Sequence, residues 1–372
     1  MSAVLEGLRR WPDIEAPELV AVDAADRLIL DESAVLRAGV DAGSIVVIGD
    51  AYGALTLGAA HAGATGIRSH LDALNGERAL AANAERAGLS EGYRTLPLEP
   101  ELVRGARIVL LRLPRSLDEL RDIAGVIAAH ADPSVVVVAG GRLKHMSLSM
   151  NEVLGEFFGR LDVSHARQKS RVLLAREPHD GHDPQPASAH VEGLELRAFG
   201  GAFAGARLDI GTRLLLDSLP AELVGGTAHD PLIDLACGTG IVGAWLATRH
   251  PNAHVYACDQ SAIAVNSARA TMLANGIDNR VEVRQDDALT ARPSASASLI
   301  ALNPPFHSGA AVTDLLAPRL FADTARVLRS GGQLWCVWNS SLGYRALLER
   351  AVGPTQQVAR NAKFTVTVST RR

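Results

Sequence analysis

An apolar run that ends at two consecutive prolines constrains this chain more than any other feature. Residues 298–302 (SLIAL) have the length and composition of a buried β-strand, and Asn303, Pro304, Pro305 and Phe306 follow directly. Two prolines cannot continue a central strand, so they stiffen the loop at its end. Open α/β sheets place their chemistry in such loops, at the carboxyl ends of parallel strands. The sequence therefore predicts a rigid functional corner at Asn303.

The residue types at this corner suit recognition of an amino group. The Asn303 side-chain oxygen and the Pro304 carbonyl can both accept hydrogen bonds from one NH2 group, and Phe306 offers a flat face to a planar base. A proline-rich turn capped by Asn303 is the plainer interpretation of the same residues. The segments upstream favour the functional interpretation.

Upstream, strands are followed by turns of small or acidic residues. Residues 231–235 indicate a strand that enters the turn 236–240 (ACGTG), whose glycines let the backbone approach a ligand closely. The next expected strand, 254–259, ends in Asp259 about twenty residues past the turn, where an acid can bind the two hydroxyls of a ribose. Residues 281–288 indicate a third strand that ends in acids.

This order of strands, glycine turn and acids resembles the class I methyltransferases that use S-adenosylmethionine (SAM). It is most similar to the bacterial ribosomal RNA guanine-N2 methyltransferases with two tandem methyltransferase-like domains. The matching segments are 208–216 (LDIGTRLLL), the glycine turn, Asp259, Asp287 with Ala288, 303–307 (NPPFH) and 361–364 (NAKF). Residues 49–55 (GDAYGAL) make the large-subunit enzyme more similar than the small-subunit one. The resemblance covers nearly the whole chain and is strong after about residue 200.

The resemblance implies an α/β protein of two tandem class I methyltransferase (Rossmann-like) domains, the N-terminal one degenerate. We expect the degenerate domain at residues 1–180, a linker at 181–190 and the catalytic domain at 191–372. The implied enzyme is a SAM-dependent rRNA (guanine-N2-)-methyltransferase that modifies the exocyclic N2 amine of a guanine, in 23S rRNA by similarity. Its product would be S-adenosylhomocysteine, and no metal is implied.

The resemblance also implies roles for single residues. Backbone NH groups at Gly238 and Gly240 would face the methionine carboxylate, where a helix dipole favours an anion, and Asp234 would bind the ammonium group. Asp287 is preferred over Asp286 for the adenine amino group. The implied SAM-binding residues are Asp209, Gly211, Thr212, Asp234, Ala236, Cys237, Gly238, Gly240, Asp259, Gln260, Asp286, Asp287, Ala288 and Asn303.

Two of these positions have a second interpretation. Ala236 stands where a glycine is often found, and we expect the turn to survive if Ala236 keeps a negative φ. Thr212 belongs to a segment that resembles a lid over the cofactor, but it could simply cap a helix at 213–219. The implied catalytic residues are Asn303, Pro304, Pro305 and Phe306.

A basic cluster late in the first half is consistent with a phosphate-binding face, although a solvated amphipathic surface explains it equally well. Phe203 and Phe364 could frame the target base or fill core. The candidate RNA-binding residues are Arg142, Lys144, Arg167, Lys169, Arg171, Phe203, Lys363 and Phe364.

The first half of the chain also alternates strands with helices, which argues for a parallel sheet, but it lacks the chemistry. Its first turn, 49–53 (GDAYG), has no closely spaced glycines, and its second strand ends at His70 where an acid should stand. Its fourth strand ends at Arg112, without the asparagine. We expect a domain that holds RNA or shields the active half. The segment 177–188 is rich in proline and lacks periodicity, as linkers do.

Composition predicts a cytoplasmic enzyme. With 372 residues the chain is long enough for about two domains. Hydrophobic residues make up 47%, yet no apolar run approaches the eighteen or so residues of a membrane span, and no signal peptide is apparent. The 3 cysteines lack CxxC spacing and indicate reduced core thiols. We expect a monomer whose partner is ribosomal RNA, naked or within a pre-ribosomal subunit.

Other functions fit the same motif. The small-subunit (16S) guanine-N2 enzymes are related, and glutamine-N5 methyltransferases of release factors also carry Asn-Pro-Pro and an aromatic residue, usually tyrosine. Adenine-N6 methyltransferases of nucleic acids are a further alternative. A non-catalytic RNA-binding or ribosome-assembly factor is the alternative from a different class.

Overall fold

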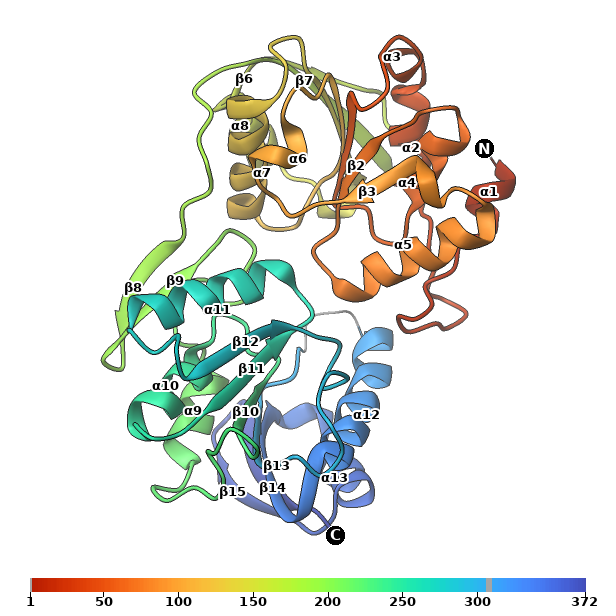
Figure 1. The fold of residues 1–372 in the computed structure, drawn as a ribbon. Coiled ribbons are helices and arrows are strands. Elements are labelled where there is room, and N and C mark those ends of the chain that lie inside the picture. Colours follow the sequence, from red (N-terminus) through yellow and green to blue (C-terminus); the bar gives the residue numbers. More distant parts are fainter. Residues whose placement is uncertain (1, 306–309) are drawn as a thin grey trace. The chain divides into compact units, whose positions relative to one another are not determined.

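The computed structural model describes residues 2–305 and 310–372. Phe306 and His307, part of the predicted functional corner, lie outside the described residues. The chain divides into two compact units, Met1–Gln185 and Pro186–Arg372. The first unit is coloured red to yellow-green and the second green to blue in Figure 1, and each is described by itself.

The first unit is built on a 7-stranded sheet with the strand order β3-β2-β1-β4-β5-β7-β6. The strands β1 to β5 are parallel, and β7 is antiparallel to β5 and β6. The strands are β1 (Ile45–Ile48), β2 (Ile67–His70), β3 (Tyr93–Thr95), β4 (Ile108–Arg112), β5 (Val136–Arg142), β6 (Phe158–Val163) and β7 (Ser170–Pro178).

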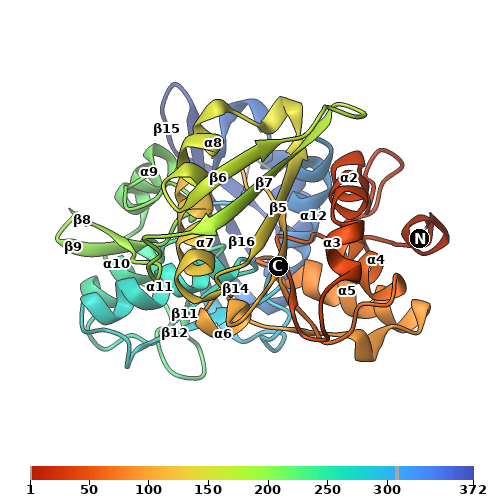
Figure 2. The ribbon, with the colours of Figure 1, turned by 90° about the horizontal axis from the view of Figure 1, so that it is seen from above.

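Two helix layers cover this sheet, and Figure 2 shows them on opposite sides of β5. Buried apolar residues of α2 and α4 form one core, and those of α6, α7 and α8 form the other. The α-helices are α1 (Ser2–Glu6), α2 (Ala24–Glu32), α3 (Ala34–Ala38), α4 (Ala54–His61), α5 (Leu74–Ala87), α6 (Pro100–Val103), α7 (Leu117–His130) and α8 (Leu148–Gly155).

The second unit repeats this topology in a 7-stranded sheet of order β12-β11-β10-β13-β14-β16-β15. A separate 2-stranded sheet pairs β8 with β9. The strands are β8 (Ala187–Val191), β9 (Leu194–Ala198), β10 (Leu232–Leu235), β11 (Val255–Asp259), β12 (Val281–Gln285), β13 (Ala297–Leu302), β14 (Leu328–Asn339), β15 (Thr355–Arg360) and β16 (Phe364–Thr370).

The helices of the second unit also form two layers (Figure 1). Residues of α9 and α10 pack in one core and those of α12 and α13 in the other. The α-helices are α9 (Ile210–Ser218), α10 (Ile241–Arg249), α11 (Ala262–Ala274), α12 (Ala310–Val327) and α13 (Arg345–Ala351). The predicted α/β fold of two methyltransferase-like copies is confirmed, because both sheets run in one strand order.

The expected linker at 181–190 differs from the structure at its end. Residues 187–191 form β8, which pairs with β9 from Ala187↔Ala198 to Val191↔Leu194. The proline-rich composition stops at Pro186, and the small and branched residues that follow can extend into a strand.

The edge of β9 that does not pair with β8 is hydrogen-bonded to side chains of α11 and of its C-cap, and not to another strand. The Asn275 amide accepts from Glu195 N at 3.0 Å and donates to Glu195 O at 2.8 Å. Thr271, one helical turn earlier in the chain, accepts from Arg197 N at 3.1 Å. Ser267, two helical turns earlier, accepts from Phe199 N at 3.0 Å. We call Ser267, Thr271 and Asn275 the helix ladder. It fixes the start of the segment that leads to α9 (Figure 1).

Candidate active site

The glycine turn lies at the carboxyl end of β10, the central strand of the second sheet. Gly240 is the N-cap of α10, with a left-handed φ of +79°, and a Cβ there would lie 2.7 Å from Met272 Cε and 2.8 Å from Ala268 Cβ. Only glycine fits that contact. At Gly238, φ is +54° and no atom lies within 4 Å of where a Cβ would stand. The backbone at Gly238 therefore faces open space that a ligand can enter.

The turn does not need the negative φ at Ala236 on which its survival was expected to depend, because φ there is +57° and the turn still forms. The turn needs a left-handed residue at this point, directly after β10. Alanine adopts that conformation at a cost of about 1–2 kcal/mol, which glycine would avoid. The turn forms nevertheless, since its backbone is held by Cys237 N, which donates to Cys258 O at 2.9 Å.

Asp234 is a buried acid on the floor of the turn. Its side chain is 2% exposed, and Oδ2 accepts from Gly243 N at 2.7 Å. Burial, opposed by that hydrogen bond and reinforced by the charge of Asp259, raises the pKa of Asp234 to about 7. A cationic group beside this carboxyl would favour its ionised form.

Asp259 ends β11 beside the same turn, as predicted. Its Oδ2 accepts from Gly238 N at 3.1 Å and its Oδ1 from Ser261 N at 3.0 Å. The carboxylate therefore lies against the glycine turn, at the strand end where dinucleotide-binding folds hold ribose hydroxyls. Gln260 follows it, and the Gln260 carbonyl accepts from Gln285 Nε2 at 2.9 Å.

The acids after β12 have different partners. Asp286 is 3% exposed and accepts from Thr290 Oγ1 at 2.6 Å, from Ala291 N at 3.0 Å and from the Tyr256 hydroxyl at 3.2 Å. Its hydrogen bonds hold the loop after β12. Asp287 forms an ion pair with Arg319 of α12. The sequence pattern did not indicate Arg319, which lies on a different element.

Asn303 follows β13 at the carboxyl end of the parallel strands and contacts the start of α9. Its Nδ2 donates to Thr212 Oγ1 at 2.9 Å and to Asp209 Oδ2 at 3.3 Å. Asp209, and not Thr212, is the N-cap of α9, because Asp209 Oδ2 accepts from Thr212 N at 3.0 Å. Pro304 is buried and Pro305 is exposed.

A narrow cavity of about 40 Å³ lies between the glycine turn, Asn303 and the start of α9. Many predicted site residues line it, and sequence reasoning missed five others: Ala204, Arg207, Thr239, Ile241 and Val242. Thr239 belongs to the glycine turn and Ile241 follows it as the first residue of α10, so both could have been inferred from the turn. The predicted residues on the wall are Phe203, Asp209, Thr212, Asp234, Ala236, Cys237, Gly238 and Asn303.

Several predicted residues stand apart from this wall. Phe364 is 5% exposed and packs in the core of the second unit against Gly211, where a Cβ would lie 3.1 Å from Phe364 Cε1. Lys363 Nζ lies 5.3 Å from the centre of the Phe364 ring.

Cys237, Cys258 and Cys336 are buried free thiols, as expected, and burial raises the pKa of each.

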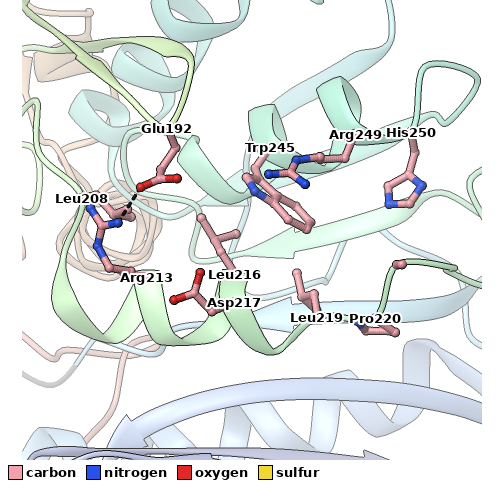
Figure 3. Close-up of a pocket in the computed structure, with 11 residues that line it drawn as sticks. Glu192, Leu208, Arg213, Leu216, Asp217, Leu219, Pro220, Trp245, Arg249 and His250 are labelled. Atoms are coloured by element: carbon pink, nitrogen blue, oxygen red, sulfur yellow. Dashed lines mark hydrogen bonds and ion pairs between the residues drawn. The ribbon is translucent and has the colours of Figure 1, made fainter.

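A larger cavity of about 420 Å³ lies between α9 and α10, on other walls of these helices. Figure 3 shows the Arg213–Glu192 ion pair at one end and Arg249 beside the Trp245 ring, with the guanidinium carbon 5.1 Å from the ring centre. It shares no lining residue with the smaller cavity. Asp234, most of the glycine turn and Asn303 line the smaller cavity, and Asp259 contacts its wall through Gly238 N, so we assign the chemistry to the smaller cavity.

In the first unit, the position that corresponds to Asn303 is Arg112. Leu111 pairs with Ile48 of β1 as Leu302 pairs with Leu235 of β10, and Arg112 follows as Asn303 does. The Arg112 guanidinium forms ion pairs with Asp23, the N-cap of α2, and with Asp26. In the first unit an ionic cluster therefore occupies the place that Asn303 has in the second unit.

Most of the predicted basic residues of the first unit lie at the end of its sheet where β5 finishes and β7 begins. Arg142 ends β5, Lys144 follows, Arg171 pairs with Gly141, and Leu143 N donates to Lys169 O at 2.9 Å. Arg167 instead forms an ion pair with Asp31 at 3.1 Å. Desolvation, and then the charges of Arg115, Lys144, Arg112 and Arg142, lower the pKa of His145. We call Arg115, Arg142, Lys144, Lys169 and Arg171 the basic edge.

Comparison with known proteins decides the family. Residues 193–368 match the methyltransferase small domain family and residues 4–179 the RLMG N-terminal domain family. Ribosomal RNA large subunit methyltransferase G of Streptomyces avermitilis is 35% identical over 370 residues, which cover 96% of this chain and 95% of that protein. The chain belongs to the ribosomal RNA large subunit methyltransferase G family. The resemblance drawn from sequence is confirmed.

Other members of the methyltransferase G family match as fully. The protein of the same name from Pseudomonas paraeruginosa is 35% identical over 365 residues and is covered to 96%. The 16S rRNA N2 methyltransferase RsmC of T. thermophilus, solved with AdoMet and guanosine, aligns with a TM-score of 0.74 at 22% identity over 94% of this chain and 92% of that one. That alignment confirms the tandem fold.

Membrane-spanning helices and clustered metal ligands are both absent from the part of the chain that the structure describes. Within residues 2–305 and 310–372, no helix has both the length and the apolar character required to cross a bilayer. Over those same ranges, no group of three or more His, Cys, Asp or Glu side chains is arranged to hold a metal ion.

Proposed function

We propose that this member of the methyltransferase G family transfers a methyl group from SAM to the exocyclic N2 amine of a guanine in ribosomal RNA of the large subunit, 23S rRNA. The observation that carries the proposal is Asn303 on the wall of the cavity formed by the glycine turn. The names of the relatives at 35% identity support the large-subunit RNA as the substrate.

The residues present fit SAM. The open space at Gly238 leaves room for a carboxylate at the N-terminus of α10, where backbone NH groups and the helix dipole favour an anion. We assign the ammonium group to Asp234, the ribose hydroxyls to Asp259, and the adenine to the loop of Asp286, Asp287 and Ala288. Phe203, 50% exposed beside the cavity, offers a flat apolar face.

Bound SAM would supply an electrophilic methyl group on a sulfonium, and the protein must orient a poor nucleophile toward it. The guanine amine is weakly nucleophilic because its lone pair is delocalised into the ring. The Asn303 side-chain oxygen and the Pro304 carbonyl would accept its two hydrogens, which favours a pyramidal nitrogen and fixes its direction. A carbon–nitrogen bond forms as the carbon–sulfur bond breaks, and the methylated nitrogen loses a proton to water.

The RNA must present the base outside a helix. An amine inside a duplex is unreachable at the bottom of a cavity, so the substrate is single-stranded or flipped RNA. We propose that the basic edge of the first unit binds RNA phosphates, with Arg167, Lys363 and Phe203 as further contacts; Phe364 fills core instead of framing the base. A ribosomal RNA substrate places the activity in the cytoplasm, and we propose that the protein acts as a monomer.

The experiment is transfer of tritiated methyl groups to deproteinised ribosomal RNA, with 23S and 16S rRNA offered separately. We expect label in guanine N2 of 23S rRNA, and a deletion strain should lack one modified guanine there. Asn303→Ala should abolish turnover while SAM binding, measured by calorimetry, is retained. Label in 16S rRNA or in adenine, or no label in either RNA, would contradict the proposal, as would a wild-type rate in the Asn303→Ala enzyme.

A further inference from the structure

The start of α9 contacts only one end of the Asn303 side chain. Both hydrogen bonds of Asn303 to this helix use the amide nitrogen, with Thr212 Oγ1 at 2.9 Å and Asp209 Oδ2 at 3.3 Å. The amide oxygen is the remaining polar atom of the side chain. Because Asn303 lines the cavity, the orientation of its amide decides whether the cavity meets an acceptor or a donor.

The chemistry of Asp209 fixes that orientation. A carboxylate can only accept hydrogen bonds, so the NH2 end of Asn303 must face it, and the reverse orientation would place two oxygens against each other. Thr212 Oγ1 lies 3.5 Å from Asp209 Oδ2, which directs the hydroxyl proton toward the carboxylate and leaves the hydroxyl lone pairs for Asn303. The two residues therefore act together.

We propose that Asp209 and Thr212 are positioning residues that hold the Asn303 oxygen toward the target amine. This inference rests on the proposed function, and it gives the two residues a role other than contact with SAM. Without them the amide can rotate, present its NH2 group, and repel the amine that it should bind.

Local packing makes the pair rigid. Asp209 Oδ2 also caps α9 through Thr212 N at 3.0 Å, and the Thr212 side chain is only 6% exposed. Gly211 has no room for a side chain, since a Cβ would lie 3.0 Å from Asp209 Oδ2 and 3.1 Å from Phe364 Cε1. Thr212 N, Thr212 Oγ1 and Asn303 Nδ2 therefore all donate to the same oxygen, Asp209 Oδ2.

The first unit has a comparable arrangement, in which the start of a helix holds an arginine instead of an asparagine. Its helix α2 begins at the N-cap Asp23, and Asp26 stands three residues later, as Thr212 stands three residues after Asp209. These two side chains hold Arg112, the residue that corresponds to Asn303. In both units the start of this helix contacts the side chain at the end of the fourth parallel strand, Arg112 in the first and Asn303 in the second.

The test compares Thr212→Val with Thr212→Ser. Valine keeps the branched shape and removes the acceptor, so kcat on rRNA should fall about tenfold or more while the Kd for SAM stays within about twofold. Serine returns the hydroxyl and should recover most of the lost rate. Asp209→Asn, which can accept or donate, should also lower kcat. Asp217→Asn on the exposed side of the same helix should leave kcat unchanged.

A direct readout separates this inference from the proposed function. The Asn303 side-chain NH2 signal in an NMR spectrum, assigned by its loss in Asn303→Ala, should exchange slowly with solvent in the wild type and faster in Thr212→Val. Faster exchange supports the inference even if rRNA is not the substrate. Unchanged exchange, an unchanged kcat in active enzyme, or a loss of SAM affinity that matches the loss of rate would overturn it.

Discussion

At the scale of single residues, the backbone conformation of Ala236 in the glycine turn is unfavourable for the stability of the fold. Its φ of +57° lies in the region where a Cβ is strained. Ala236→Gly should therefore raise the free energy of unfolding by about 0.5–1 kcal/mol, after allowance for the greater entropy of glycine in the unfolded chain. Denaturation in guanidinium chloride measures this. Ala257→Gly, within β11, is the control and should destabilise.

Asp234 couples the same site to pH. Its folded pKa is raised to about 7 from 3.8, so the folded protein retains a proton that the unfolded chain releases between these values. The stabilisation from Asp234 is fully present below pH 3.8 and is lost as pH rises through 7, by at most about 1.4 kcal/mol for each pH unit.

Asp234→Asn should remove this contribution to the pH dependence. The difference in the free energy of unfolding between wild type and variant, followed without SAM from pH 4 to pH 7, should change steadily in favour of the variant. Taking the difference removes the contributions of other carboxyl groups with a raised pKa. Glu119 is one of these, since burial raises its pKa to about 8. A difference that is constant over this range would show that Asp234 is ionised throughout.

At the scale of elements, the helix ladder determines where the segment before α9 begins. Asn275 bonds both backbone groups of Glu195, and no strand covers that edge of β9 within the described residues. Asn275→Ala should cost about 2 kcal/mol, because two backbone groups lose their partners. Chemical denaturation measures the cost, and trypsin should cut faster at Arg197. Leu273→Ala on the exposed side of α11 is the control.

Elements with a strong local pattern were predictable from sequence. The apolar runs predict β10, β11 and β13 to within one or two residues, because buried parallel strands are continuous apolar segments. The hairpin β8–β9 was not predictable, since one edge of β9 is bonded by residues about seventy to eighty positions later in the chain. Asn303 was predictable as a site residue for a local reason, the prolines after it. The orientation of its amide was not, because Asp209 lies 94 positions away.

At the scale of the whole molecule, two units of one topology divide the proposed work. The second unit has the glycine turn, the strand-end acids and Asn303, and the first has the basic edge. Charge that binds phosphates acts on every RNA sequence alike, so it contributes affinity without choosing the guanine.

Arg142→Gln combined with Lys144→Gln should therefore weaken RNA binding with little change in kcat at saturating RNA. The slope of log K against log salt should fall by about 0.7–0.9 for each phosphate that no longer has a cationic partner on the protein. Filter binding over a salt series measures it. Arg160→Gln is the control, since Arg160 lies 3.0 Å from Asp162 in an ion pair on β6. An equal effect of Arg160→Gln would mean that the basic edge has no special part in binding.

The cluster around Arg112 bears on the history of the first unit. Burial raises the pKa of Asp26 to about 6 even with Arg112 beside it. An asparagine in place of Arg112 would leave Asp23 and Asp26 repelling each other with no neutralising group, so the protein would be weakened before any activity could return. A change from arginine to asparagine at this position would therefore require changes at Asp23 and Asp26 as well.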